Sequence, residues 1–446
     1  MFGKLQGYFR GSDLYFTEYG KVAYKVCMKI HFIGDRGVSM RALKSMAEAR
    51  GNTVSGSDRQ SGGHKPENVE GCDLVVYTNA VRDDNCELLR ARELGIPTIE
   101  RAAYLGELSR AHTVTVAVAG CHGKSTTAAM LGEVFPRRDT TVHVGVAGAS
   151  RVGGSKYFVT EACEYNRSFL HLTPDVGVIL NIQYDHPDCY RSTEELVNAY
   201  AEFCAVSRAT LINGDDRLCE GIHPKPLLFG LGTTCDYRAD DIVNSNGFRV
   251  FTYKPRGGSA MRIELSVAGE HNVYNALATL AVADIAGLKL GEAKQALEGF
   301  CGLPRRFERR GLAYGKAVIV DYAHHPAEIA ATINTAREMF PSVAVVFQPH
   351  TYSRTAAMLD DFAAALEKAD EVMLAPVFAA RETPTESGSS ERLADKLGAR
   401  TVGVLDPDGI IERVKALPQK AVIFMGAGDV DKLADRFIDE YNKSEK

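Results

Sequence analysis

The sequence lacks the compositional extremes that would set it apart from ordinary globular proteins. Its 446 residues include 16 prolines and 41 glycines, too few for a collagen-like or low-complexity disordered chain. Lysine and arginine total 52 against 57 acidic residues, so the net charge of −5 gives no electrostatic reason to bind nucleic acid or anionic lipid. Since 45% of the residues are apolar and 24% are charged, the chain is expected to fold throughout.

Paired cysteines and membrane-length apolar runs are also missing. The ten cysteines form no CxxC pair and no zinc-ligand spacing, which favours reduced thiols in a cytoplasmic protein. No apolar stretch reaches the roughly 18 residues that cross a bilayer, and the segment before Met28 has no apolar signal-peptide core. We therefore expect a cytoplasmic protein without membrane partners, in which residues 1–27 are an extension before the first domain.

What the sequence does contain is a regular alternation of strand and helix patterns. At about 150 residues per domain the length predicts three domains, and the alternation predicts the α/β class. We place the domains at residues 28–111, 112–303 and 304–446. The first has a Rossmann-like layout, because the strand KIHFIG leads through a glycine turn into a helix and Asp58 ends the next strand.

The strongest local motif follows the apolar strand TVTVAVA and precedes a predicted helix. It reads Gly120-Cys121-His122-Gly123-Lys124-Ser125-Thr126. Such a turn aims backbone N–H groups at phosphate oxygens, its lysine reaches the outer phosphates, and its serine hydroxyl can bind Mg²⁺. Val118 replaces the first glycine of the strict phosphate-loop pattern, so an ordinary turn is the alternative. The strand-to-helix context favours a triphosphate site in the second domain.

Two further residues lie where such a site needs metal ligands. Glu161 ends the predicted strand KYFVTEA, and His186 follows the predicted strand VGVILN. Adjacent parallel strands bring their carboxyl ends to one crevice, where ligands bind in open α/β sheets. The alternative for His186 is a loop histidine whose ring is hydrogen-bonded to neighbouring residues. The phosphate loop in the same domain favours the interpretation as a metal ligand.

Polar residues also gather near the second domain break. Asn272 and Asn275 are three residues apart and so share a helix face, where their amides can bind a nucleotide or simply cap the helix. Arg306 at the break is either a solvated hinge residue or a phosphate clamp.

The third domain carries polar side chains directly after two apolar strands. These residues are Asp321, Tyr322, His324 and His325 after the first strand, and Gln348, His350 and Arg354 after the second. Burying such groups without a function is costly, although exposed loop residues are the alternative. The pattern favours a second ligand site at this edge.

Taken together, these motifs resemble those of the Mur ligase family, and the resemblance covers the chain from Met28 onward. GCHGKSTT, NIQYDHPDCY, GEHNVYNALA and RRFE are similar to its motifs and follow the same order. VDYAHHPAEI, FQPHTYSRT and the GSD…GH…N succession resemble the alanine-adding branch in particular.

The resemblance implies an ATP-dependent amide ligase of peptidoglycan precursor synthesis. An N-terminal Rossmann-like domain would bind the UDP-sugar, a central P-loop domain ATP, and a C-terminal Rossmann-like domain the amino acid. ATP would phosphorylate the lactyl carboxylate of UDP-N-acetylmuramate, and L-alanine would displace phosphate from the acyl phosphate to form the amide. The resemblance leaves the protein a monomer or a homodimer.

Residue roles also follow from the resemblance, position by position. Lys124 would neutralise the transferring phosphoryl group, Ser125 and Glu161 would hold one Mg²⁺, and His186 a second. Asn272 and Asn275 would face ATP, while Arg306 and Asp321 would connect the nucleotide with domain closure. The UDP-sugar would be bound by Ser57, Asp58 and His64, and the amino acid by Tyr322, His324, His350 and Arg354.

Three departures from the family pattern bear on the substrates. The first glycine turn reads GDRGVSM and so carries Asp35 and Arg36. The segment EACEYN, at the end of the strand that carries Glu161, has two fewer acidic residues than the family pattern. Thr351 stands where the alanine-adding branch normally has an arginine. The alternatives are a divergent paralog that adds another amino acid or peptide, and a catalytically weak ATP-binding regulator. A nucleotide-binding oxidoreductase would explain the Rossmann layout but not the phosphate loop.

Overall fold

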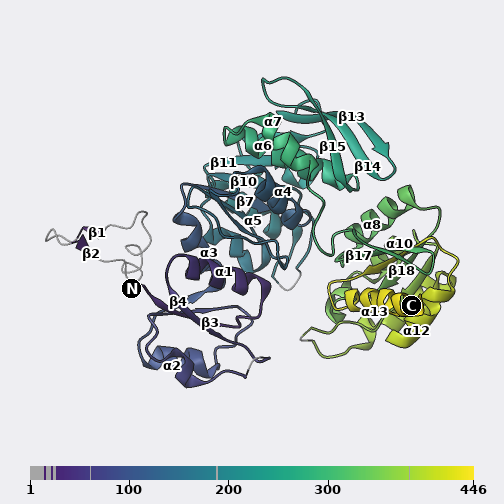
Figure 1. Ribbon diagram of the computed structural model, residues 1–446, viewed down its shortest axis with the longest axis horizontal. Helices are drawn as coiled ribbons and strands as arrows, with labels where there is room; N and C mark the ends of the chain where they lie inside the picture. Colours follow the sequence, from purple (N-terminus) through teal and green to yellow (C-terminus); the bar gives the residue numbers. More distant parts are fainter. Residues whose placement is uncertain are drawn as a thin grey trace. The chain divides into compact units, whose positions relative to one another are not determined.

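The computed structural model of the chain (Figure 1) describes residues 15–16, 22–23, 27–60, 62–186, 189–380 and 382–445. Most of the predicted extension 1–27 therefore lies outside the described residues; within it β1 (Tyr15–Phe16) pairs antiparallel with β2 (Val22–Ala23). The α/β prediction is confirmed, because parallel sheets alternate with helices along the chain. Within the described ranges, no helix has the length and apolar character needed to cross a membrane.

The described chain forms two compact units. Unit 1 comprises residues 1–240, 253–261 and 274–297, and unit 2 comprises residues 241–252, 262–273 and 298–446. The division passes through strands β13, β14 and β15 rather than between the predicted domains. The domain boundaries near residues 111 and 304 therefore stay a prediction.

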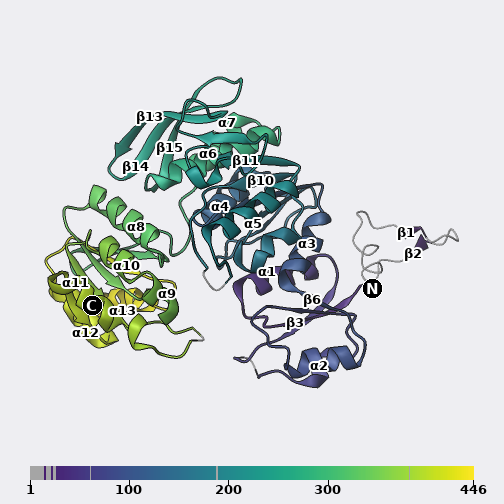
Figure 2. The same ribbon diagram turned by 180° about the vertical axis from the view of Figure 1, so that it is seen from behind.

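Unit 1 begins with a parallel sheet in the order β4-β3-β5-β6, with β3 and β5 at its centre. Helices α1 and α3 contribute to the core on one face, and α2 packs on the other, as Figure 2 shows. The strand–turn–helix predicted at the start of this domain is present: Gly34, directly after β3, has a φ of +84° and begins the turn that leads to α1. The elements are β3 (Lys29–Ile33), α1 (Val38–Ala49), β4 (Thr53–Ser57), η2 (Pro66–Val69), β5 (Leu74–Tyr77), α2 (Cys86–Glu93), β6 (Thr98–Glu100) and α3 (Arg101–Arg110).

The second sheet has the strand order β15-β14-β13-β12-β11-β10-β7-β9-β8, and its strands from β8 to β13 pair in parallel. β7, β9 and β10 are almost completely buried because helices cover this part of the sheet, so they read as continuous apolar runs. The strands are β7 (Val114–Ala119), β8 (Thr140–His143), β9 (Tyr157–Glu161), β10 (Val176–Ile179), β11 (Ala209–Asn213), β12 (Leu227–Gly230), β13 (Tyr237–Ser245), β14 (Phe248–Lys254) and β15 (Met261–Ala268). The helices are α4 (Lys124–Val134), η3 (Tyr165–His171), α5 (Thr193–Ala205), η4 (Arg217–Cys219), α6 (His271–Ile285) and α7 (Leu290–Glu298).

One apolar core joins the two sheets of unit 1. Phe32 of β3 and Tyr104 of α3 belong to the same buried cluster as Phe169 and Phe203 beside the second sheet. Helix α3 packs directly on η3. The shared core explains why the first predicted domain and most of the second form a single compact unit.

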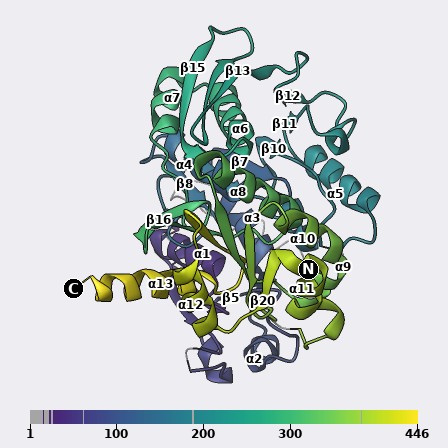
Figure 3. The same ribbon diagram turned by 90° about the vertical axis from the view of Figure 1, so that its right-hand side faces the viewer.

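The main sheet of unit 2 has the order β16-β17-β21-β18-β19-β20, and only β16 is antiparallel. Figure 3 shows α12 and α13 on one face and α10 and α11 on the other; each face has its own buried core. Strands β16 and β20 are missing from the sequence predictions, because one is charged and the other is half-exposed with an internal glycine. The strands are β16 (Glu308–Ala313), β17 (Lys316–Asp321), β18 (Val343–Phe347), β19 (Glu371–Leu374), β20 (Thr401–Val404) and β21 (Ala421–Met425). The helices are α8 (Pro326–Met339), α9 (Tyr352–Ala357), α10 (Leu359–Leu366), η5 (Glu386–Gly388), α11 (Ser390–Leu397), η6 (Gly398–Arg400), α12 (Pro407–Ala416) and α13 (Asp431–Ser444).

A buried ion pair attaches the β14 segment of unit 2 to helix α8. Arg249 is only 4% exposed and donates two hydrogen bonds to the Glu338 carboxylate, at 2.9 and 2.7 Å. Such a bidentate pair fixes both position and orientation. It explains why this part of β14 groups with the C-terminal sheet.

The close packing of α3 on η3 depends on a glycine in the helix. A Cβ atom on Gly106 would lie 2.3 Å from the carbonyl oxygen of His171. We expect Gly106→Ala to lower the free energy of unfolding by about 1–3 kcal/mol, because the helix must move away from η3.

Gly291 in α7 is the matched control, because a Cβ there meets nothing within 4 Å. We expect Gly291→Ala to raise stability by roughly 0.5–1 kcal/mol, since alanine loses less backbone entropy on folding. Urea unfolding of the three proteins checks both signs, and equal shifts for the two variants would contradict the packing argument.

Candidate nucleotide and substrate sites

The phosphate loop lies between β7 and α4, as the sequence predicts. Gly120 has a φ of +139° and Gly123, the N-cap of α4, has a φ of +84°. A Cβ on Gly123 would come within 2.5 Å of the Asn275 side-chain oxygen, so no larger residue fits there. Residues 124–126 begin the helix, whose N-terminal N–H groups and positive dipole end suit an anion.

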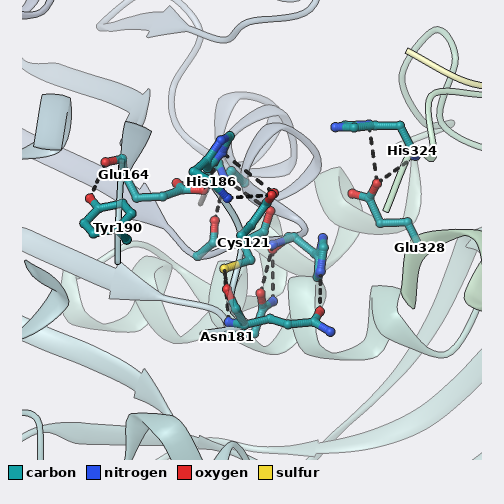
Figure 4. Close-up of polar contacts among 12 residues, drawn as sticks. Cys121, Glu164, Asn181, His186, Tyr190, His324 and Glu328 are labelled. Atoms are coloured by element: carbon teal, nitrogen blue, oxygen red, sulfur yellow. Dashed lines mark hydrogen bonds and ion pairs between the residues drawn. The ribbon is translucent and has the colours of Figure 1, made fainter. Parts of the chain in front are cut away.

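The loop is held by residues that follow β10, as Figure 4 shows for Asn181 and Cys121. The Asn181 side chain accepts a hydrogen bond from the His122 N–H at 2.8 Å and donates one to the His122 carbonyl at 3.0 Å. The Cys121 thiol donates to the Gln183 carbonyl at 2.8 Å, and His122 Nε2 lies 2.8 Å from Gln183 Oε1. Burial raises the pKa of Cys121 to about 12, so this thiol stays neutral.

Lys124 is paired with a carboxylate that the sequence predictions omit. Its Nζ donates to the Gly120 carbonyl at 2.5 Å, to the Cys121 carbonyl at 3.2 Å and to Glu164 Oε1 at 3.0 Å. Glu164 is only 2% exposed. Burial alone would lower the pKa of Lys124, but the Glu164 charge, the hydrogen bond to Glu164 and smaller contributions from neighbouring groups together outweigh it and raise that pKa above the usual value. The ammonium is therefore fully charged at neutral pH.

The predicted metal ligands lie beside this lysine. The Ser125 hydroxyl donates to Glu161 Oε2 at 2.6 Å, and the Gly145 N–H donates to Glu161 Oε1. His186 Nε2 lies 3.8 Å from Glu164 Oε1. Among the described residues no group of three or more His, Cys, Asp or Glu side chains is arranged to hold a metal ion. The hydroxyl and carboxylate oxygens nevertheless fit a hard cation such as Mg²⁺, which takes few protein ligands besides phosphate and water.

Of the two predicted asparagines, Asn275 contacts the phosphate loop. It accepts a hydrogen bond from the Thr127 hydroxyl at 3.1 Å and is 4% exposed. Asn272 donates to the Ala268 carbonyl at 2.7 Å within unit 2. A role of Asn272 toward ATP stays a prediction.

The residues predicted for the UDP-sugar lie at the carboxyl end of the first sheet. Ser57 ends β4, and its hydroxyl lies 3.1 Å from His64 Nδ1. The Asp58 carboxylate accepts the Gln60 N–H at 2.9 Å. In the altered glycine turn, Asp35 accepts a hydrogen bond from Lys44 at 3.0 Å, so its charge is balanced within the domain.

A cavity of about 370 Å³ lies between α1 and the loop after β8. Its lining includes Arg41 and Ser45 from α1 and Arg151 from the loop. The same loop carries Gly145, whose N–H binds Glu161. The cavity is therefore bounded by α1, which follows the first glycine turn, and by the loop whose Gly145 contacts the predicted metal ligand Glu161.

In unit 2, Asp321 ends β17 and anchors the segment that contains Arg305 and Arg306. It accepts hydrogen bonds from the Phe307 and Ala323 N–H groups, both at 2.7 Å. Burial raises the pKa of Asp321 to about 6, although Arg306 and these two hydrogen bonds oppose the shift. The Arg306 guanidinium lies 5.2 Å from the Tyr322 ring centre and 3.9 Å from Glu328.

The four residues predicted for the amino acid share one edge of the C-terminal sheet. The His324 ring lies 5.3 Å from Tyr322 and 5.8 Å from His350, centre to centre. His350 stacks on Phe378 at 5.7 Å. Arg354 is near both histidines and lowers the pKa of each, after the larger effect of burial. The structure thus brings Tyr322, His324, His350 and Arg354 into one cluster.

Comparison with known proteins identifies the family. The Mur ligase family catalytic domain matches residues 29–113, the Mur ligase middle domain matches 118–283, and the Mur ligase glutamate ligase domain matches 305–428. A curated UDP-N-acetylmuramate–L-alanine ligase of Acetivibrio thermocellus is 39% identical over 92% of this chain and 95% of its own length. The chain belongs to the Mur ligase family.

Further relatives support this placement. A UDP-N-acetylmuramate–L-alanine ligase of Caldanaerobacter subterraneus subsp. tengcongensis is 38% identical over 93% of this chain and 98% of its own length. The crystal structure of UDP-N-acetylmuramate–alanine ligase from Thermotoga maritima superposes with a TM-score of 0.78 and 30% identity, and covers 94% of this chain and 100% of that chain. A murein peptide ligase from Psychrobacter arcticus, at 22% identity and a TM-score of 0.66, shares the fold over 92% of this chain and 98% of its own.

The sequence reasoning missed three polar residues of this Mur ligase. Glu164 and Asn181 lie within the quoted segments EACEYN and NIQYDHPDCY, so their proximity to known motifs was the available sign. Glu87, described below, lies in no motif. Pro187 and Asp188 of the second segment lie outside the described residues.

His324 of this Mur ligase is expected to be neutral. Its Nδ1 lies 3.0 Å from the Tyr322 carbonyl, which can only accept, so Nδ1 carries the proton. Burial lowers the pKa of His324 to about 4, although Glu328 opposes the shift. This value is below the pKa of roughly 6.5 of an unfolded histidine. The neutral His324 ring therefore makes its full contribution to the stability of the folded protein above about pH 6.5, and this contribution is lost as the pH falls through about 4.

Nitrogen-15 NMR of labelled histidine checks both the tautomer and the titration. We expect an Nδ1–H ring that becomes charged only near pH 4, with the resonance assigned through His324→Asn. A ring that becomes charged near pH 6.5 would contradict the structure.

Proposed function

We propose that this protein joins L-alanine to the lactyl carboxylate of UDP-N-acetylmuramate with ATP, giving ADP and phosphate in peptidoglycan precursor synthesis. The observation that carries the proposal is the charged Lys124 in a strand-to-helix phosphate loop, within a chain whose named relatives match over 92% or more of its length. We also propose that the protein is cytoplasmic and is a monomer or a homodimer.

The chemistry requires an activated acyl group, because a carboxylate is a poor electrophile. A lactyl carboxylate oxygen attacks the γ-phosphorus of ATP, and the bond from that phosphorus to the bridging oxygen breaks to release ADP. The alanine nitrogen then attacks the carbonyl carbon, the bond to the phosphate oxygen breaks, and the nitrogen loses its proton. The protein contributes positioning and charge neutralisation, and Lys124, the first residue of α4, is the cation proposed to serve the transferring phosphoryl group.

Metal binding is assigned to residues around the same loop. Ser125 and Glu161 are proposed to hold one Mg²⁺ and His186 a second, since they supply the oxygen and imidazole donors next to Lys124. When bound, Mg²⁺ would neutralise charge on the phosphate oxygens.

The substrate assignments follow the clusters described above. Ser57, Asp58 and His64 are proposed to bind the UDP-sugar, and the cavity between α1 and the loop after β8 is proposed to receive its muramoyl part. The amino acid is proposed to be bound by Tyr322, His324, His350 and Arg354. We propose that ATP is contacted by Asn272 and Asn275. Nucleotide binding is proposed to be connected with domain closure through Arg306 and Asp321.

A phosphate-release assay tests the proposed function. Purified protein with ATP, Mg²⁺, UDP-N-acetylmuramate and L-alanine should release phosphate, and omission of either acceptor should abolish the release. Lys124→Ala should lower kcat by at least about 100-fold, because the transferring group loses its buried cation. Equal phosphate release with and without the acceptors would contradict the proposed function.

Thr351 motivates the second candidate, a paralog that adds another amino acid. Its φ is +66°, an uncommon conformation for a β-branched residue, and it replaces the family's arginine. If the site binds an amino-acid carboxylate, Thr351→Arg should lower the KM for L-alanine by about tenfold, the effect of one charge-assisted hydrogen bond.

Thr351→Gln is the control, because glutamine is long and polar but uncharged. KM values for a panel of amino acids, measured with both variants and the parent, check the prediction. A parent protein that prefers another amino acid over L-alanine would favour the paralog.

A further inference from the structure

A buried carboxylate lies behind the proposed UDP-sugar residues, and no step described so far uses it. Glu87 is the second residue of α2 and is 0% exposed. Its Oε2 accepts hydrogen bonds from the Ser57 hydroxyl at 2.6 Å and lies 3.0 Å from His64 Nδ1. Both of these partners are residues proposed to bind the UDP-sugar.

The second oxygen of Glu87 is equally well occupied. Oε1 accepts a hydrogen bond from the Asn68 side chain at 2.6 Å and one from the Lys65 N–H at 3.3 Å. The buried His31 Nε2 lies 3.6 Å from the same oxygen. Strand β4, the loop after it, η2 and strand β3 therefore all converge on one side chain of α2.

Glu87 is ionised throughout the physiological range. Burial would raise its pKa, but the hydrogen bonds from its partners outweigh burial and lower that pKa to about 2. Its stabilising contribution is therefore complete above the roughly 4.3 of an unfolded glutamate, and is lost as the pH falls toward 2. A permanent buried charge is available to orient the groups around it.

The consequence for His64 follows from donor and acceptor chemistry. A carboxylate can only accept, so the Nδ1 atom that faces Glu87 carries a proton. The ring orientation is thereby set, and Nε2 lies on the side away from Nδ1. The His64 side chain is 15% exposed, whereas that of Glu87 is completely buried, so His64 is the member of the pair that a ligand can reach.

The loop between Ser57 and His64 needs such an anchor. Gly62 and Gly63 have φ values of +96° and +77°, and a Cβ on either would meet nothing within 4 Å. No side chain packs at these two positions; a backbone hydrogen bond from the Gly63 N–H to the Asp58 carbonyl, at 3.1 Å, closes the turn, and glycines otherwise allow many conformations. The hydrogen bonds to Glu87 hold both ends of the segment that runs from Ser57 to His64.

We propose that Glu87 is a positioning residue of the UDP-sugar site, which acts by fixing His64 and Ser57 in the orientation that binds the sugar nucleotide. The inference rests on the proposed function. Glu87 does not touch the substrate; it lowers the entropy that the loop would otherwise lose on binding.

A double-mutant cycle with Glu87→Gln and His64→Ala tests the proposal. Glutamine keeps the shape but offers one acceptor oxygen, so it cannot satisfy donors on both sides. Calorimetric titration with UDP-N-acetylmuramate should give a Kd raised about tenfold for Glu87→Gln, with the KM for ATP unchanged. In the His64→Ala background, Glu87→Gln should raise the Kd by less than about threefold, because the residue through which it acts is gone.

Glu93→Gln is the matched control, since Glu93 lies on the same helix with a side chain 66% exposed, and its Kd should equal that of the parent. Glu87→Asp keeps the charge and provides a second variant if Glu87→Gln does not fold; its shorter side chain should also raise the Kd. An unchanged Kd in Glu87→Gln or Glu87→Asp, or additive effects in the cycle, would overturn the inference. A parent protein that does not bind UDP-N-acetylmuramate would instead overturn the proposed function, and the inference with it.

Discussion

The charge on Lys124 is the constraint around which the nucleotide site is organised. An ammonium group at the positive end of a helix, largely out of contact with solvent, is unfavourable unless acceptors surround it. Two carbonyls of the phosphate loop and the buried Glu164 carboxylate supply those acceptors. The glycines bend the loop with positive φ values, and the Asn181 hydrogen bonds to His122 hold it in that shape. The ends of β7, β9 and β10 therefore have to lie side by side, which the order of the sheet provides.

Buried carboxylates recur at the carboxyl ends of the sheets, and their hydrogen-bond donors decide their charge. Glu87 has donors on both oxygens and a pKa of about 2. Asp321 has the nearby charge of Arg306 and two backbone donors, which together do not outweigh burial, and its pKa rises to about 6. The first is a permanent charge that can position its neighbours, whereas the second changes protonation just below neutral pH.

The sequence predicted most of the elements that position the sites. The strands before the phosphate loop, Glu161 and His186 are buried apolar runs that end in polar residues, and such runs are recognisable without any structure. Edge strands β16 and β20 were missed, because an exposed edge needs no apolar run. Glu164 and Asn181 were missed as functional residues for another reason: a polar residue inside a motif shows its role only once its partner is known.

The α/β class, the phosphate loop and the membership of the Mur ligase family could be read from the residues alone, because these depend on local periodicity and on short ordered motifs. Three features required the folded chain: the carboxylate that pairs with Lys124, the contacts by which Glu87 joins Ser57 to His64, and the core that two predicted domains share. The three hydrogen-bonded contacts join residues 23, 30 and 40 positions apart in the chain. Their formation depends on strand order and helix placement, which local propensity does not specify.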